Sequence, residues 1–142
     1  MIRELDTKDI PQVYAIECDN FSQPWTKEAI LGEIASDRSH YLVASDGEEI
    51  LGFIGFWKIF DEGHITNIAV SKSNHNQGIG SRLVKGMLAL GPGLGIDKFT
   101  LEVRVGNKQA IALYEKFGFK SAGIRKGFYD LPKEDAMIMW RE

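Results

Sequence analysis

The sequence predicts a single-domain α/β fold over residues 1–142, with a mixed, mostly antiparallel sheet and about four flanking helices. Short apolar segments rich in β-branched and aromatic residues alternate with segments of helical spacing. In the first half, tight turns at 46–49 and 61–63 join consecutive strands, which makes those strands antiparallel. In the second half, helices separate the strands, as crossover connections require. A chain of this length buries a substantial core.

In the first half, the strand that opens the chain is followed by two helices. Thr7 or Asp9 can cap the first helix, because a side-chain oxygen there accepts an N–H that the helix start leaves unpaired. Pro24-Trp25 then interrupts the helical pattern, and Thr26 caps the second helix. Three strands follow in direct succession. The strands are expected at 2–5, 41–44, 50–60 and 64–70, and the second helix at 26–35.

In the second half, helices and strands alternate. A helix with an inward apolar face opens at Gly78, and the run Gly91-Pro92-Gly93 stops it. Asn107 caps the next helix, which ends at Gly118. The expected elements are helices at 78–90 and 107–118, and strands at 99–105, 119–124 and 136–140.

Composition argues against several classes of protein. The net charge of −3 and the pI near 5.6 argue against a nucleic-acid partner, which binds a basic surface. Cys18 is the only cysteine, so the chain cannot form an internal disulfide and suits a reducing cytoplasm. No apolar run reaches membrane-spanning length, and residues 1–10 lack the apolar core of a signal peptide. We therefore expect a cytoplasmic protein with no membrane partner. We also expect no metal site, because the histidines show no ligand spacing with one another or with Cys18: His40, His64 and His75.

The stretch from 67 to 81 has the pattern of an anion site. An apolar strand, Ile68-Ala69-Val70, runs into a polar turn that ends in Gly78-Ile79-Gly80, where a helix opens. Glycine has no Cβ, so backbone N–H groups there approach an anion closely, and the helix adds its positive end. The apolar strand that follows carries one carboxylate, Glu102, whose burial is costly without a purpose. The pattern predicts a phosphate-bearing cofactor beside a proton acceptor.

Other phosphate motifs do not fit this turn. A P-loop needs a lysine after its last glycine, and none follows Gly78 or Gly80. The dinucleotide fingerprint needs a third glycine, where Leu83 stands. The simpler alternative is that the two glycines only make a tight strand-to-helix turn.

Several motifs in order resemble the GNAT superfamily of N-acetyltransferases across essentially the whole chain. They are NIAV, the QGIG turn, LEVRVGN and ALYEKFGF. Within the superfamily the chain is most similar to the RimI type, on the evidence of Pro24-Trp25-Thr26 and of Tyr129 followed by Glu134-Asp135-Ala136-Met137. Enzymes of that type acetylate the N-terminal alanine of a small-subunit ribosomal protein. The family turn usually begins with Gln or Arg, and His75 takes that place here.

The resemblance implies a sheet splayed into a V, with acetyl-CoA as the co-substrate. The exposed main chain of the 68–70 strand would pair with the pantetheine arm, and the N–H of Val70 would face the thioester oxygen. Asn107 would contact the pantetheine, although its position also suits a helix cap alone. The implied cofactor-binding residues are Ile68, Ala69, Val70, Asn76, Gln77, Gly78, Ile79, Gly80, Ser81 and Asn107.

Glu102 and Tyr114 are the candidate catalytic residues. An amine must lose a proton before it attacks a thioester, and a half-buried Glu102 with a raised pKa can accept it. The alternative for Glu102 is a salt bridge to Arg104 or to a lysine. Tyr114 stands two helical turns after Asn107, and the resemblance makes it the acid that protonates the CoA thiolate. Its spacing alone favours a core position between Ile111 and Phe117.

The resemblance places the acceptor peptide at Trp25, Tyr129 and Glu134, with a packed tryptophan and a surface hairpin loop as the alternatives. We expect the acceptor to be a protein N-terminus that receives the acetyl group directly, without an acyl-enzyme. Two rivals stay open. One is acetylation of a lysine side chain or a small amine, and the other is a non-catalytic sensor that binds acyl-CoA.

Overall fold

The computed structural model describes residues 1–21, 24–130 and 132–142, and in them one seven-stranded sheet lies between helices. The strands are β1 Ile2–Glu4, β2 Ser39–Asp46, β3 Glu49–Ile59, β4 Glu62–Val70, β5 Lys98–Arg104, β6 Lys120–Asp130 and β7 Lys133–Arg141. The α-helices are α1 Ile10–Asn20, α2 Lys27–Ile34, α3 Ile79–Leu90 and α4 Lys108–Lys116. Three short 3₁₀ helices are η1 Thr7–Asp9, η2 Lys72–Asn74 and η3 Pro92–Leu94.

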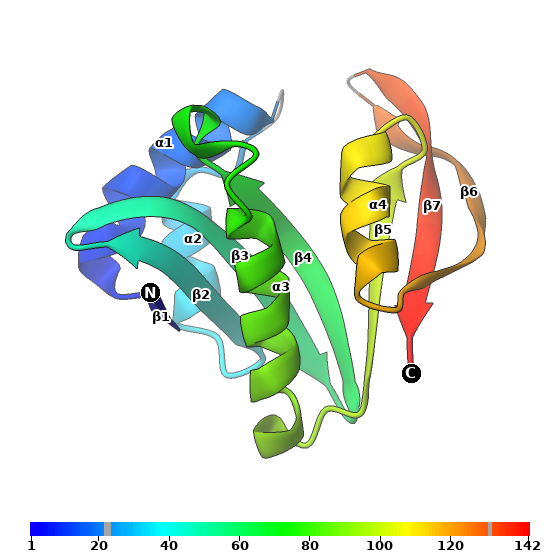
Figure 1. The fold of residues 1–142 in the computed structure, drawn as a ribbon, viewed down its shortest axis with the longest axis horizontal. Helices are drawn as coiled ribbons and strands as arrows, with labels where there is room; N and C mark the ends of the chain where they lie inside the picture. Colours follow the sequence, from blue (N-terminus) through cyan, green and yellow to red (C-terminus); the bar gives the residue numbers. More distant parts are fainter. Residues whose placement is uncertain (22–23, 131) are drawn as a thin grey trace.

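The sheet has the order β1-β2-β3-β4-β5-β7-β6, and among these described strands only β4 and β5 pair in parallel. Their ladder is short, because Glu62–His64 pairs with Lys98–Thr100 and the two strands then diverge. Figure 1 shows β4 and β5 together at one end and far apart at the other. The predicted α/β fold with a splayed, mostly antiparallel sheet is therefore confirmed.

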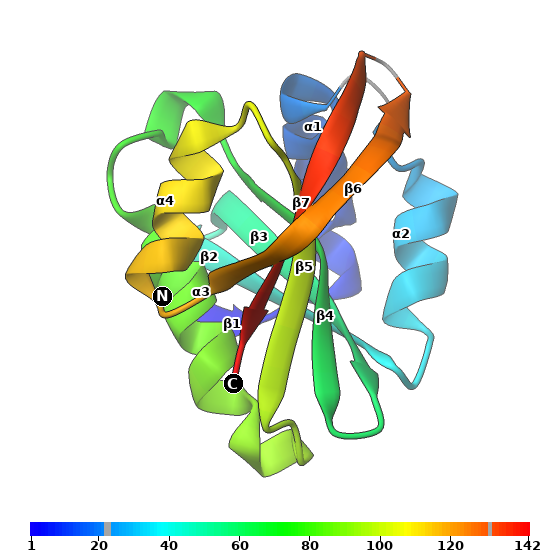
Figure 2. The same cartoon turned by 90° about the vertical axis from the view of Figure 1, so that its right-hand side faces the viewer.

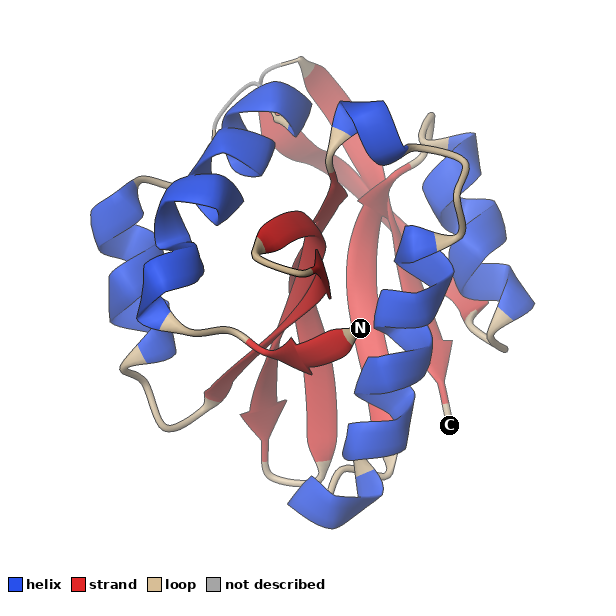
Figure 3. Cartoon of the chain, turned by 60° about the vertical axis from the view of Figure 1, so that its left-hand side comes forward, coloured by secondary structure: helices blue, strands red, loops and turns tan. Residues whose placement is uncertain are grey.

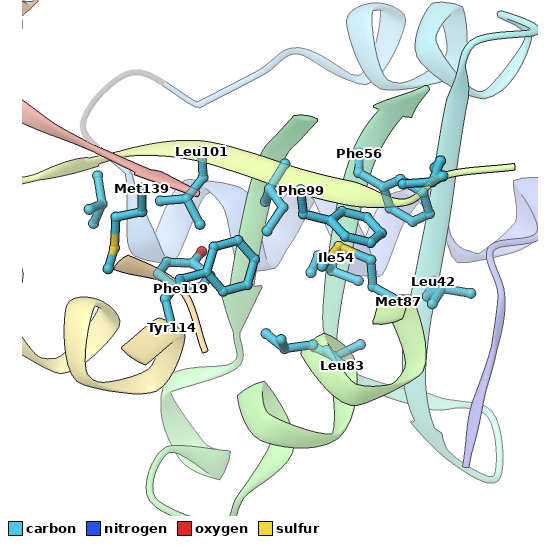
Figure 4. Packing of buried hydrophobic residues seen from close by; sticks show 14 of the residues in the cluster. Leu42, Ile54, Phe56, Leu83, Met87, Phe99, Leu101, Tyr114, Phe119 and Met139 are labelled. Atoms are coloured by element: carbon cyan, nitrogen blue, oxygen red, sulfur yellow. The ribbon is translucent and has the colours of Figure 1, made fainter. Parts of the chain in front are cut away.

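The helices cover both faces of the sheet (Figures 2 and 3), with α1 and α2 on one face and α3 and α4 on the other. Strand β2 shows how the sequence achieves this, because alternate residues of a strand face opposite sides. Leu42 packs in the cluster that contains the α3 residues Leu83 and Met87 (Figure 4), whereas Tyr41 and Val43 pack in the cluster under α1 and α2. None of the helices in the described ranges is long and apolar enough to cross a membrane.

The helix caps agree with the sequence except at the first helix. The side chain of Thr26 accepts from Ala29 N–H, and that of Asn107 accepts from Ala110 N–H, as predicted. Neither Thr7 nor Asp9 makes the expected cap of α1. Instead Asp6 and Asp9 form a capping box around η1, and the carboxylate of Asp9 is buried against the Arg3 guanidinium.

The last hairpin is longer than the sequence indicates. The expected strands at 119–124 and 136–140 extend in the structure to Lys120–Asp130 and Lys133–Arg141. The reason is that β6 is an edge strand with almost every residue exposed, so its second half has no alternation of apolar and polar residues to reveal it. Tyr129 consequently lies in a strand and pairs with Glu134, not in a loop. In the same way β4 begins at Glu62, inside the turn expected at 61–63.

Candidate active site

Two cavities open where β4 and β5 diverge. The larger has a volume of about 570 Å³, and the smaller has a volume of about 310 Å³. Among the described residues, five line both cavities, and so the cavities meet in the middle of the V: Asn20, Ile68, Asn107, Ala110 and Tyr114. The larger cavity also reaches Glu102 and Trp25, and the smaller reaches the glycine turn at the start of α3.

Near the smaller cavity, one edge of β4 has none of the described strands paired with it, because β4 pairs with β5 only over Glu62–His64. Ser71 N–H donates to the Leu51 carbonyl of β3 at 2.8 Å. Neighbouring residues of a strand direct their backbone groups to opposite edges, so the N–H and the carbonyl of Val70 point away from β3. The Val70 carbonyl accordingly accepts from the Asn20 amide at 3.1 Å and from His75 Nε2 at 2.9 Å. The predicted position of Val70 N–H is therefore compatible with a thioester oxygen in the V.

The glycine turn has the backbone shape that the sequence suggests. Gly78 is the N-cap of α3 with φ of 76°, a left-handed conformation that favours glycine, and Asn76 also has a positive φ of 66°. A Cβ on Gly80 would lie 3.2 Å from the Leu113 side chain. The predicted residues that line the smaller cavity include Ala69, Val70, Asn76, Gly78, Ile79, Gly80 and Ser81. Gln77 belongs to the turn but does not line the cavity, and His75 is engaged with Val70.

Glu102 projects from β5 into the larger cavity and pairs with a residue that the sequence does not suggest. His64 Nε2 lies 2.9 Å from Glu102 Oε2 and 3.2 Å from Oε1. This hydrogen bond lowers the pKa of Glu102 and outweighs partial burial, which acts in the opposite direction. The expectation of a raised pKa is therefore wrong. The alternative predicted for Glu102 is a salt bridge to Arg104 or to a lysine, and the partner found is instead His64 from β4.

Arg104 and Glu134 form a separate pair at the rim of the larger cavity. Arg104 Nη1 lies 3.2 Å from Glu134 Oε1, and Glu134 Oε2 accepts from Gly106 N–H at 2.8 Å. The Arg104 guanidinium also stacks 4.2 Å from the centre of the Tyr129 ring. Of the three predicted acceptor residues, Trp25 and Tyr129 line the larger cavity, whereas Glu134 does not line it and pairs with Arg104, which does.

Tyr114 is both a core residue and a residue that lines the two cavities. The residue is buried in α4, and its ring packs edge-on against Phe119 with the ring centres 5.5 Å apart (Figure 4). It also lines both cavities at the point where they meet. Burial raises the pKa of Tyr114, so the phenol stays protonated at neutral pH and can donate a proton.

A second carboxylate, Glu17 on α1, lines the larger cavity and is not among the predicted site residues. Its oxygens accept from Trp25 N–H at 3.0 Å and from the Asn67 side-chain amide. The sequence could have indicated Glu17 in one way, because it is a charged residue at a position where the helix otherwise has apolar residues. His64 gives a weaker signal, because only the register of β4 with β5 brings it to Glu102. Within the described ranges, no three His, Cys, Asp or Glu side chains are grouped so as to hold a metal ion.

Comparison with known proteins agrees with this geometry. The acetyltransferase (GNAT) family pattern matches residues 10–119. The chain belongs to this family and is an acetyl-CoA-dependent N-acetyltransferase.

Its relatives point to one branch of that family. A Bacillus subtilis (strain 168) protein described as a candidate [ribosomal protein bS18]-alanine N-acetyltransferase is 38% identical over 98% of this chain and 93% of its own length. The crystal structure of the ribosomal-protein-S18-alanine N-acetyltransferase from Escherichia coli superposes with a TM-score of 0.91 and 31% identity, covering 99% of this chain and 92% of the other. Ard1 from Thermoplasma volcanium gives a TM-score of 0.89 at 30% identity, covering 99% and 95%.

Proposed function

We propose that residues 1–142 act as one domain that transfers an acetyl group from acetyl-CoA to the N-terminal α-amine of a protein. The relatives named for bS18-alanine acetylation span nearly the whole chain and support an N-terminal alanine of a small-subunit ribosomal protein as the acceptor. A ribosomal acceptor also implies action in the cytoplasm, and a protein substrate rather than a nucleic acid or a membrane.

The observation that carries this proposal is the meeting of two cavities at Tyr114. The smaller cavity offers the β4 edge that points away from β3 and the glycine turn, which suit a pantetheine arm and a pyrophosphate. The larger cavity is lined by Glu102, which pairs with His64, and it has room for an acceptor. Acetyl-CoA supplies an activated thioester. Two cavities that meet suit direct transfer, in which the amine from one and the thioester from the other react without an acyl-enzyme.

In this proposal the His64–Glu102 pair takes the proton of the amine. The carboxylate is ionised at neutral pH, because its pKa is lowered, and it holds the imidazole through Nε2. A proton accepted from the amine, directly or through water, can be shared across that hydrogen bond. Val70 N–H stabilises the oxygen that gains charge, and Tyr114 returns a proton to the departing thiolate.

The cost of deprotonation supports an α-amine over a lysine. A free α-amine has a pKa near 8 and a lysine one near 10.4, so deprotonation at pH 7 costs about 1 kcal/mol for the first and about 5 kcal/mol for the second. A carboxylate with a lowered pKa is a weak base. An acceptor amine that is cheap to deprotonate therefore suits Glu102 better than a lysine does. Trp25 and Tyr129 both line the larger cavity and leave a slot suited to the end of a chain.

Acetyl-CoA turnover with paired peptides tests the function. One peptide begins with a free alanine, and its partner has a blocked N-terminus and an internal lysine. We expect the first to be acetylated far faster, with the acetyl group on the α-nitrogen by mass spectrometry. Efficient acetylation of the blocked peptide, with little on the free N-terminus, would reject the α-amine acceptor in favour of a lysine. Tight acetyl-CoA binding without turnover on either peptide would instead indicate an acyl-CoA sensor.

A further inference from the structure

The carboxylate of Glu17 is buried between three parts of the molecule. Only 1% of the residue is exposed, and it lies on α1 where that helix packs against β4. One oxygen accepts from the backbone N–H of Trp25, which precedes α2. The other accepts from the side-chain amide of Asn67, on β4. One side chain therefore links α1, the Trp25 segment and β4.

Burial of the Glu17 carboxylate costs free energy, and the packing of α1 against β4 does not by itself require a charged side chain at this position. Burial raises the pKa of Glu17, which shows that the site disfavours the charge. The other buried positions of α1 are the apolar residues Ile10, Val13 and Ile16. A carboxylate at the fourth position has a distinct property, because it can accept from two separate donors at once.

All three linked residues line the larger cavity. The same cavity is lined by Glu102 and Val103 of β5. Residues 24–26 belong to no helix or strand, so Trp25 N–H has no partner in a sheet or helix ladder. Glu17 supplies that partner and thereby fixes the position of Trp25 at the lining of the larger cavity.

A second contact one turn further along α1 fixes the same helix to β4. The Asn20 amide donates to the Ile16 carbonyl within α1 and to the Val70 carbonyl of β4. Residues three apart on a helix lie on one face, so Glu17 and Asn20 both face β4. They hold α1 against this strand at two points, Asn67 and Val70. Asn20 lines both cavities, whereas Glu17 lines only the larger one.

We propose that Glu17 is a positioning residue that sets the width of the acceptor slot, and that it thereby favours acceptors with a small first residue. This inference rests on the proposed N-terminal acetylation. Glu17 touches neither reacting atom in this scheme. It holds Trp25 and Asn67 in place at the lining of the larger cavity, so the space left for the first side chain of the acceptor is fixed.

Glu17→Gln is the direct test, because the side chain keeps its shape but has one oxygen instead of two. One donor, Trp25 N–H or the Asn67 amide, then loses its acceptor. The lost hydrogen bond lies within the protein and acts on the peptide only through the displaced Trp25 or Asn67, so one buried hydrogen bond, about tenfold in an equilibrium constant, sets the scale of the effect. We expect the KM for an alanine-first peptide to rise by about that factor, with kcat and the KM for acetyl-CoA nearly unchanged. The preference for alanine-first over leucine-first peptides should fall. Glu48→Gln, on an exposed hairpin, is the matched control and should change neither.

The double variant Glu17→Gln with Asn67→Asp restores both hydrogen bonds. The introduced glutamine then accepts from Trp25 N–H and donates to the introduced carboxylate. We expect the peptide KM and the alanine preference to recover, which a loss of general stability would not explain. Hydrogen exchange at the Trp25 amide, followed by NMR, reports on the contact without turnover: exchange should be faster in Glu17→Gln and slow again in the double variant.

Each failure has its own signature. An unchanged peptide KM and alanine preference in folded Glu17→Gln, or unchanged exchange at Trp25, would overturn the role of Glu17 while wild-type acetylation stands. A wild-type enzyme that leaves free N-termini unmodified would overturn the proposed function itself.

Discussion

His64 Nε2 lies 2.9 Å from Glu102 Oε2, although 38 residues separate the two in sequence. His64 is the last residue of β4 that pairs with β5, opposite Thr100, so the contact is made where the V begins to open. The hydrogen bond lowers the pKa of Glu102 and keeps the carboxylate ionised at neutral pH. In the proposed mechanism, the catalytic base is therefore a pair of residues rather than a single carboxylate.

The first prediction concerns the pH dependence of this pair. A base must be ionised to act, so activity falls when the pH drops through its pKa. Because His64 lowers the pKa of Glu102, His64→Ala should raise it and move the acidic limb of kcat/KM to higher pH. The free energy of unfolding depends on pH in the same direction. The ionised carboxylate of Glu102 stabilises the fold at pH values above the usual pKa of a glutamate, and this contribution is lost as the pH falls through the lowered pKa.

His64→Gln provides the control for this experiment, because its amide can still donate to Glu102. Its acidic limb should lie closer to that of the wild type than the limb of His64→Ala does. Identical limbs in the wild type and His64→Ala, measured under conditions where chemistry limits the rate, would contradict the pairing.

The second prediction separates catalysis from cofactor binding. Glu102→Gln and Tyr114→Phe keep the shapes of the side chains, and the loss of a general acid or base lowers rates by roughly 10²–10⁴-fold. We expect kcat to fall within that range while calorimetry shows acetyl-CoA affinity nearly unchanged. Tyr41→Phe is the matched control, because Tyr41 is also buried but packs in the cluster under α1 and α2. Near-wild-type kcat in both Glu102→Gln and Tyr114→Phe would refute the assignment.

Local patterns in the sequence predict the parts of the site that depend on neighbours along the chain. The Gly78 turn and the Asn107 cap follow from nearby residues, and the structure confirms both. The contacts of Glu102 and Glu17 join residues that only tertiary packing brings together. Their partners cannot be named without the register of β4 and β5 and the docking of α1 on β4.

The same limit explains the last hairpin. An exposed edge strand buries no face, so no alternation records it, and the sequence alone suggests a loop at Tyr129. The fold class, by contrast, depends on the order and type of elements, which the buried strands and amphipathic helices record well.

The third prediction concerns Glu134, which supports the rim of the larger cavity through Arg104. Glu134→Gln weakens the pair with Arg104 and keeps one acceptor for Gly106 N–H. Because both charged side chains are partly exposed, the cost in stability should be about 1 kcal/mol or less. We expect a rise in peptide KM of about threefold to tenfold, the effect of one weakened contact, with acetyl-CoA KM unchanged.

Glu62→Gln is the control for Glu134→Gln. Glu62 lies 3.9 Å from Lys98, at the end of the sheet where β4 and β5 are still paired. This change should leave both KM values at wild-type levels. If the two variants behave alike, the position of Arg104 does not matter for the acceptor.

The fourth prediction tests the glycine turn. Gly78 has φ of 76°, which costs other residues roughly 1–2 kcal/mol and a β-branched residue more. No protein atom lies within 4 Å of a Cβ built there, so valine would meet strain rather than a clash within the protein. A loss of cofactor binding must therefore be separated from the strain. Gly47, in the β2–β3 hairpin, has φ of 63° and equally open space, and it is remote from both cavities. Gly47→Val and Gly78→Val should lose similar stability in thermal unfolding, but only Gly78→Val should bind CoA much more weakly in calorimetry. Equal CoA affinities in the two folded variants would show that the turn does not hold the pyrophosphate.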